Sequence, residues 1–266
     1  MKIKLYSKHQ VMCVIVIFLY RYLAHADSVW GKKWSFRIGR STTYKIIPET
    51  CEAIISALQP TYLPPMTRNM WRNVADDFWQ KWNFPNCIGA IDGKHVRIKA
   101  PKNSGSEFFN YKKFFSIVLM AACDANYTFT WVDLGFYGSI NDGGIWINSH
   151  LGTALEQGTA DLPLSEPLPG GVEPLPFFFV GDEAFPLKPY MMRPYAKPKG
   201  RRRQEDEIPR NEAAFENFDE DSAAVNERAD VNPALRTLTL PQRIFNYRLS
   251  RARRVIENAF GILVAK

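Results

Sequence analysis

Residues 88–97 read Ile88-Gly89-Ala90-Ile91-Asp92-Gly93-Lys94-His95-Val96-Arg97, an apolar run followed by a carboxylate, a glycine and alternating apolar and basic residues. The apolar run predicts a β-strand that carries Asp92 inside a core or at its edge. A carboxylate rarely lies in a buried strand unless it is paired or binds a metal. Asp-Gly is also a strong hairpin-turn signal, so this stretch alone leaves strand and turn open.

Two later segments favour the strand. Residues 175–180 form a second buried-strand pattern, which Gly181 and Asp182 follow directly. Residues 246–263 have apolar side chains at helical spacing, with Glu257 among them. Two strand-end aspartates and a helical glutamate are what a two-metal phosphoryl-transfer site requires, because carboxylates hold divalent ions on both sides of the scissile phosphate. The sequence therefore predicts Asp92, Asp182 and Glu257 as catalytic metal ligands.

Three blocks around these carboxylates carry a family resemblance. They read FPNCIGAIDGKH at 84–95, GDEAFPL at 181–187 and FNYRLSRARRVIENAFG at 245–261. In this order they resemble the catalytic blocks of PIF/Harbinger-type transposases, a family that includes the Harbinger-transposase-derived nucleases of animals. The resemblance runs from about residue 36 to residue 263. It implies a DDE superfamily endonuclease that cleaves DNA phosphodiester bonds with Mg²⁺ or Mn²⁺.

The fold implied by the resemblance is α/β, with an RNase H-like mixed sheet flanked by helices. Residues 114–124 and 127–136 predict two further strands, separated by a turn at 124–126. With the Asp92 strand they would make the antiparallel start of such a fold. His95 would face away from Asp92 on its strand, which favours a core role or a contact behind the ligands over metal ligation. Lys112 and Lys113 precede the second strand, where they either contact phosphate or simply lie in solvent.

Asp142 has two interpretations. It follows a Gly-Ser turn and precedes a predicted helix over 144–155, so either Asn141 or Asp142 suits the helix cap. The resemblance favours a second role, since animal Harbinger-derived nucleases carry an aspartate at this place. The predicted metal ligands are therefore Asp92, Asp142, Asp182 and Glu257.

Residues 1–83 predict a small helical segment. Ser41 or Thr42 suits the cap of a helix that Pro48 would bend, and the prolines from Pro60 onward predict a linker before a helix over 70–84. The family has a helix-turn-helix-like segment here. The residue types alone favour an ordinary pair of amphipathic helices with a basic, solvated edge.

The first 28 residues resemble a secretory signal. Lysines precede an apolar run over 11–20, and Ala24-His25-Ala26 resembles a cleavage site. The run is too short for a comfortable membrane span. Because the three downstream blocks involve many more residues, we interpret the signal as spurious and expect a nuclear protein without membrane association.

Residues 84–266 predict the nuclease domain, with an acidic, mobile insert at about 199–240. The net charge of +7 fits a nucleic-acid partner. Candidate phosphate contacts at the start of the insert and on the last helix are Arg201, Arg202, Arg203, Arg251 and Arg254. A solvated loop and an arginine ladder paired with acidic residues are the alternatives. The family normally continues past Leu263, so we expect a C-terminal truncation.

The four cysteines are scattered and form no CxxC pair, which argues against a zinc knuckle. Cys87 and Cys123 lie in strand-like runs and should be buried free thiols. The resemblance also implies a separate Myb-like DNA-binding partner. A different class of function stays open: a domesticated, catalytically silent DNA-binding or scaffold protein.

Overall fold

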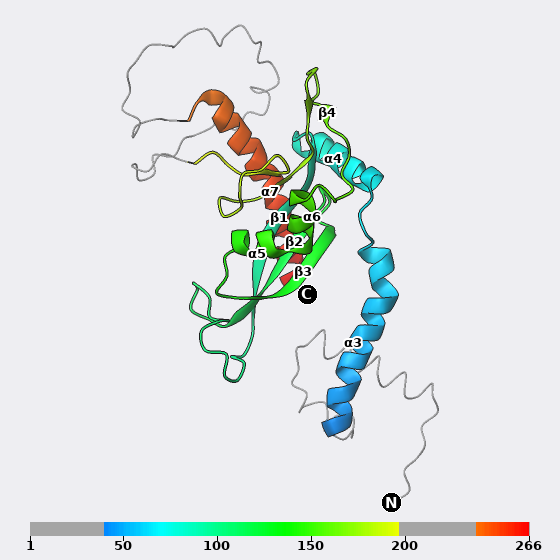
Figure 1. Cartoon of the computed structure of the whole chain (residues 1–266), viewed down its shortest axis with the longest axis vertical. Helices are drawn as coiled ribbons and strands as arrows, with labels where there is room; N and C mark the ends of the chain where they lie inside the picture. The colour runs from blue at the N-terminus through cyan, green and yellow to red at the C-terminus, as the bar shows by residue number, and fades with distance from the viewer. Residues whose placement is uncertain (1–39, 197–237, 266) are drawn as a thin grey trace, which may run out of the picture.

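The computed structural model describes residues 40–196 and 238–265, and within them a five-stranded sheet flanked by helices (Figure 1). The strand order is β3-β2-β1-β6-β7. The strands span Cys87–Arg97 (β1), Ser116–Cys123 (β2), Phe129–Tyr137 (β3), Phe178–Val180 (β6) and Met191–Met192 (β7). A separate pair joins β4 (Glu166–Pro167) to β5 (Pro174–Leu175).

The sheet is mixed. β1, β2 and β3 pair antiparallel, whereas β6 runs parallel to β1 and to β7. Asp92 lies in the middle of β1 opposite Ala121 of β2, so a hairpin turn at Asp92-Gly93 is excluded and the strand prediction is confirmed. Three antiparallel strands followed by parallel ones, with helices on both faces, confirm the predicted RNase H-like fold.

Strand alternation divides the core into two layers. On β2, Ala121 and Cys123 pack toward the long helix α7 (Leu240–Ala265), while Met120 and Ala122 pack toward α5 (Asp142–Asn148) and α6 (His150–Glu156). Such alternation follows from the two-residue period of a strand. Helix α4 (Arg68–Trp82) contributes side chains to both layers. The sheet thus separates α7 from α5 and α6.

The helix predicted over 246–263 is confirmed and extends further in both directions as α7. Its buried side chains recur at helical spacing and pack onto β1, β2 and β6. They are Leu249, Ala252, Val255, Ile256, Ala259 and Phe260. Arg254 and Glu257 lie on the exposed side of the same helix.

Two element predictions need correction. The single helix expected over 144–155 is broken at Ser149, whose hydroxyl accepts a hydrogen bond from the Gly152 N–H and so caps a new helix, α6. The strand expected over 175–180 is only three residues long as β6. Pro176 separates it from β5 and cannot donate to a sheet ladder, because proline has no backbone N–H.

The N-terminal part of the described chain is a single helix, α3 (Arg40–Tyr62), which projects from the body in Figure 1. It continues through Pro48 and Pro60, so a linker beginning at Pro60 is wrong. Each proline removes one N–H donor, yet the Leu63 N–H still donates to the Gln59 carbonyl. The first helix of a helix-turn-helix would precede Gly39, which lies outside the described residues.

Other predictions also fall outside the described residues: the signal-like run at 11–20, the arginines Arg201, Arg202 and Arg203, and nearly all of the insert at 199–240. Cys87 and Cys123 are buried free thiols, as predicted. Within residues 40–196 and 238–265, no helix combines the length and the apolar character needed to cross a bilayer.

Candidate metal centre

Three aspartates converge at one edge of the core. Asp92 comes from the middle of β1, Asp142 is the first residue of α5, and Asp182 follows β6. One carboxylate oxygen from each lies within 4.8 Å of the others, and all three side chains are partly buried. The structure therefore brings together three of the four predicted ligands.

Glu257 lies outside this 4.8 Å group. Its Oε1 is 2.8 Å from Nη2 of Arg253, one helical turn earlier on α7. The positive charge of Arg253 also acts on Asp92, whose carboxyl pKa it lowers against the larger, opposing effect of burial. Arg253 thus interacts with Glu257 and with the aspartate cluster at the same time. Sequence reasoning missed Arg253, although its i, i+4 spacing to Glu257 was a usable signal.

Glycines make the convergence possible. A Cβ atom on Gly93 would lie 2.0 Å from Oδ1 of Asp142, closer than any real Cβ contact. A Cβ atom on Gly143 would lie 2.2 Å from the carbonyl oxygen of Ala184. The Asp-Gly pair at 92–93 is therefore a close-packing feature, because the missing side chain leaves room for the carboxylate of Asp142.

Gly93→Ala is expected to lower the free energy of unfolding by about 1–3 kcal/mol, the usual cost of overpacking, and to weaken divalent-ion binding by displacing Asp142. Urea denaturation and calorimetric titration with Mn²⁺ measure the two effects. Gly261→Ala in α7 is the matched control, because nothing lies within 4 Å of its Cβ position. It should leave ion binding unchanged and gain roughly 0.5–1 kcal/mol from helix propensity. Normal ion binding by Gly93→Ala would contradict this account of the glycine.

The cluster is electrostatically unfavourable when it holds no cation. Burial raises the pKa of the Asp92 carboxyl from its ordinary 3.8 to about 6, and Asp142 and Asp182 add to the rise. The Gly93 N–H donates to Asp92 Oδ1 at 2.9 Å and acts in the opposite direction. Burial and the charge of Asp182 also raise the pKa of Asp142, while Lys112 lowers it. Buried like charges of this kind favour binding of a cation or a proton.

These shifts predict how the stability of the metal-free protein depends on pH. Because the folded-state pKa of Asp92 is above its unfolded value, its contribution is fully present below about pH 3.8 and is lost as the pH rises through about 6. The loss from Asp92 alone is up to about 3 kcal/mol. Denaturation in EDTA across this range should show the fall, and Asp92→Asn should flatten it. Asp133→Asn, on β3 and outside the cluster, should keep the wild-type slope; an unchanged slope in Asp92→Asn would refute the prediction.

Neighbouring contacts fix the other two aspartates. Oδ1 of Asn141 accepts the Gly144 N–H at 2.7 Å, so Asn141 is the cap of α5 and Asp142 is not needed for that role. Asp182 Oδ1 accepts the Ala184 N–H at 2.9 Å. Arg193 donates to the carbonyls of Glu183 and Phe185 at 3.3 and 3.2 Å and so supports the Asp182 loop.

The donor set fits a hard divalent cation. Carboxylate oxygens within 4.8 Å of one another are the ligands that Mg²⁺, Mn²⁺ and Ca²⁺ prefer. The cluster contains no thiolate or imidazole. Since a two-metal site needs ions about 3.5–4 Å apart, the three carboxylates are close enough to bridge such a pair.

The predicted DNA contacts have mixed outcomes. The Arg251 guanidinium lies 5.8 Å from the centre of the Tyr247 ring, and Arg254 is exposed on α7. Neither position distinguishes a phosphate contact from a surface role, so both stay predictions. Lys112 lies near the aspartate cluster, since its charge lowers the pKa of both His95 and Asp142.

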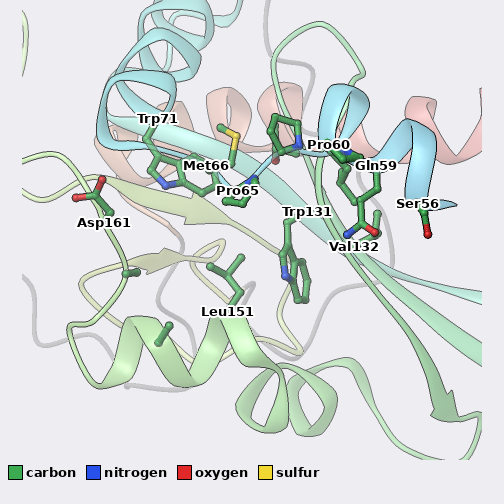
Figure 2. Close-up of a pocket in the computed structure, with 15 residues that line it drawn as sticks. Ser56, Gln59, Pro60, Pro65, Met66, Trp71, Trp131, Val132, Leu151 and Asp161 are labelled. Carbon is green, nitrogen blue, oxygen red and sulfur yellow. The ribbon is translucent and has the colours of Figure 1, made fainter.

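A cavity of about 600 Å³ lies beside the C-terminal end of α3 and is separate from the aspartate cluster (Figure 2). Its lining is mainly apolar and includes Met66, Trp71, Trp131 and Leu151. Its acidic residue, Asp161, pairs with Arg68 at 2.9 Å. An apolar cavity of this kind does not suit a phosphate, and the aspartate cluster remains the candidate site.

The part of the chain that carries this cluster matches a known family. A family model described as "DDE superfamily endonuclease" matches residues 91–266. The match includes Asp92, Asp142, Asp182 and Glu257. It covers well over half of the chain.

Curated relatives extend the comparison. "Protein ALP1-like" of Arabidopsis thaliana is 29% identical over 177 residues, which cover 60% of this chain and 42% of that protein. "Putative nuclease HARBI1" is 22% identical over 167 residues in Xenopus laevis (61% and 43% covered) and 22% identical over 162 residues in Homo sapiens (61% and 42% covered). These matches confirm the resemblance to Harbinger-transposase-derived nucleases. The chain spans about two-fifths of the length of these relatives, and no solved structure matches it.

Proposed function

The chain belongs to the DDE superfamily endonuclease family, and from that premise we propose that it is a divalent-metal-dependent nuclease that cleaves phosphodiester bonds in DNA. The observation that carries the proposal is the convergence of Asp92, Asp142 and Asp182 within 4.8 Å. Three partly buried carboxylates at such distances are costly unless a cation shares them. The nuclease names of the relatives point the same way at low identity.

In this proposal the chain supplies the metal ligands and the backbone that positions them. Asp92, Asp142 and Asp182 hold the cations, and Gly93 and Gly143 allow the close approach of their elements. Bound Mg²⁺ or Mn²⁺ would supply Lewis acidity, lowering the pKa of an attacking water and stabilising the leaving oxygen. Because burial raises the carboxyl pKa values of Asp92 and Asp142, protons compete with the cation for these oxygens as the pH falls.

We assign Glu257, whose Oε1 lies 2.8 Å from Nη2 of Arg253, as the fourth ligand. Glu257→Gln should then weaken Mn²⁺ binding by about 10- to 100-fold, as changes around a metal site usually do. Calorimetric titration measures this directly, without reference to cleavage. If Glu257 only forms an exposed ion pair, its removal should cost under about 1 kcal/mol of stability and leave Mn²⁺ affinity unchanged. Glu183→Gln, an equal charge change beside Asp182, is the control.

The first test of the function is Mg²⁺-dependent nicking of supercoiled DNA by the full chain. The second is cleavage of a linear substrate that carries the ends of a Harbinger-type transposable element. Cleavage that EDTA abolishes and Mn²⁺ restores supports the proposal. A catalytically silent DNA-binding protein would bind the DNA in both conditions and never cut it. Nuclear localisation and a Myb-like partner are further parts of the proposal, tested by imaging of a tagged protein and by pull-down.

A further inference from the structure

A loop between β1 and β2, at 98–115, presents an aromatic and a cationic side chain beside the aspartate cluster. The loop extends beyond one end of the sheet in Figure 1. Tyr111 is 78% exposed, and Nζ of Lys112 lies 5.3 Å from the centre of its ring. An exposed ring beside a flexible cation is a common feature of surfaces that bind single-stranded nucleic acid.

A buried asparagine, Asn110, makes three hydrogen bonds within and beside the loop. Asn110 is 3% exposed, and its Oδ1 accepts the backbone N–H groups of Lys112 and Phe114 at 3.0 and 3.2 Å. Its Nδ2 donates to Ser116 Oγ at 2.9 Å. Lys113 adopts a φ of 62°, which is unfavourable for a side chain with a Cβ atom. These hydrogen bonds order the backbone on both sides of Tyr111. They therefore present its ring in a defined position, which stacking requires.

Strand geometry places this tip next to the aspartates. Gly93 and His95 are two residues apart on β1, so they face the same side of the sheet roughly 7 Å from each other. Asp142 lies over Gly93, and the ring centres of His95 and Tyr111 are 5.5 Å apart in a T-shaped arrangement. Tyr111 and the carboxylate of Asp142 are therefore neighbours along one face.

The surrounding charge suits a polyanion. Between residues 97 and 115 the basic residues are Arg97, Lys99, Lys102, Lys112 and Lys113, against Glu107 as the acidic residue. Each of the five basic residues is exposed. These residues give the loop an excess of positive charge, which attracts the phosphates of a nucleic acid.

We propose that Tyr111 and Lys112 bind the nucleotide next to the scissile phosphate, with an unpaired base stacked on the Tyr111 ring and its phosphate beside Lys112. This rests on the proposed nuclease function and adds a substrate class: DNA that is single-stranded or locally opened at the cleavage position. A fully paired duplex buries its base faces and cannot offer one to the ring.

The test is equilibrium binding of the full chain, in Ca²⁺, to a duplex with a short single-stranded tail that contains 2-aminopurine. A blunt duplex of equal length is the comparison. The wild-type chain should prefer the tailed duplex and change the 2-aminopurine fluorescence. Tyr111→Ser should lose about 5- to 100-fold in affinity for the tailed duplex, and Tyr111→Phe should keep it, because stacking needs the ring alone. Lys112→Gln should reduce the salt slope by about one.

Tyr62→Ser is the matched control, since Tyr62 is a 71% exposed tyrosine on the projecting helix α3. It should bind both DNAs as the wild type does. Equal affinity and fluorescence in Tyr111→Ser and wild type would overturn the proposed stacking on Tyr111 and leave the nuclease function standing. A loss in Tyr111→Phe equal to that in Tyr111→Ser would also overturn stacking. A wild-type chain that binds neither DNA would overturn both proposals.

Discussion

Asp92→Asn is expected to reduce Mg²⁺-dependent DNA cleavage by about 10²- to 10³-fold or more, the scale on which single groups that stabilise transition-state charge act. The substitution keeps the shape of the side chain and removes the negative charge at the centre of the cluster. The same change should raise the free energy of unfolding of the metal-free protein at pH 7. The expected gain is up to about 3 kcal/mol, because the pKa of Asp92 is raised to about 6 by burial and by the neighbouring aspartates.

This combination, a more stable protein that no longer cuts, separates loss of the site from loss of the fold. Nicking assays and thermal denaturation in EDTA measure the two halves. Glu183→Gln removes one charge from the residue after Asp182 and should leave both readings near wild type. Undiminished cleavage by Asp92→Asn would remove the aspartate cluster from the mechanism altogether.

The position of Asp92 was predictable because the apolar run before it and the alternation of the strand both indicate a buried strand. The apolar run from Ile88 to Ile91 fits a buried strand, and the two-residue period alone assigns alternate residues to opposite layers. α7 was equally predictable, since its buried residues follow the helical period closely.

The details of the site depend on contacts between elements distant in sequence, which no local pattern encodes. An Asp-Gly pair such as Asp92-Gly93 locally predicts a turn. The actual role of Gly93 is to leave room for Asp142, about fifty residues later. Arg253 reads as one of several arginines on a helix, and only the packing of α7 on β1 brings its charge to Asp92. Whether Glu257 leaves Arg253 for a cation depends on a ligand, so sequence patterns alone cannot decide it.

The contrast between Asp142 and its neighbour Asn141 gives a second large effect. Asn141 caps α5 through its 2.7 Å bond to the Gly144 N–H, so Asn141→Ala should lower the free energy of unfolding by about 0.5–2 kcal/mol. Asn141→Ser keeps a capping oxygen and should lose much less. Neither change alters the charge of the cluster, so Mn²⁺ affinity should stay close to wild type in both.

Asp142→Asn should have the opposite profile. The cap remains on Asn141, and removing one of three mutually repelling carboxylates should hold or raise the stability of the metal-free protein. Mn²⁺ affinity should fall by at least about 10- to 100-fold and cleavage by about 10²- to 10³-fold. Calorimetric titration, denaturation in EDTA and nicking assays on both variants give two opposite orders: Asn141→Ala is worse in stability, and Asp142→Asn is worse in ion binding and cleavage. Full Mg²⁺-dependent cleavage by Asp142→Asn would leave Asp92, Asp182 and Glu257 as the ligands and reduce Asp142 to a neighbour of the site.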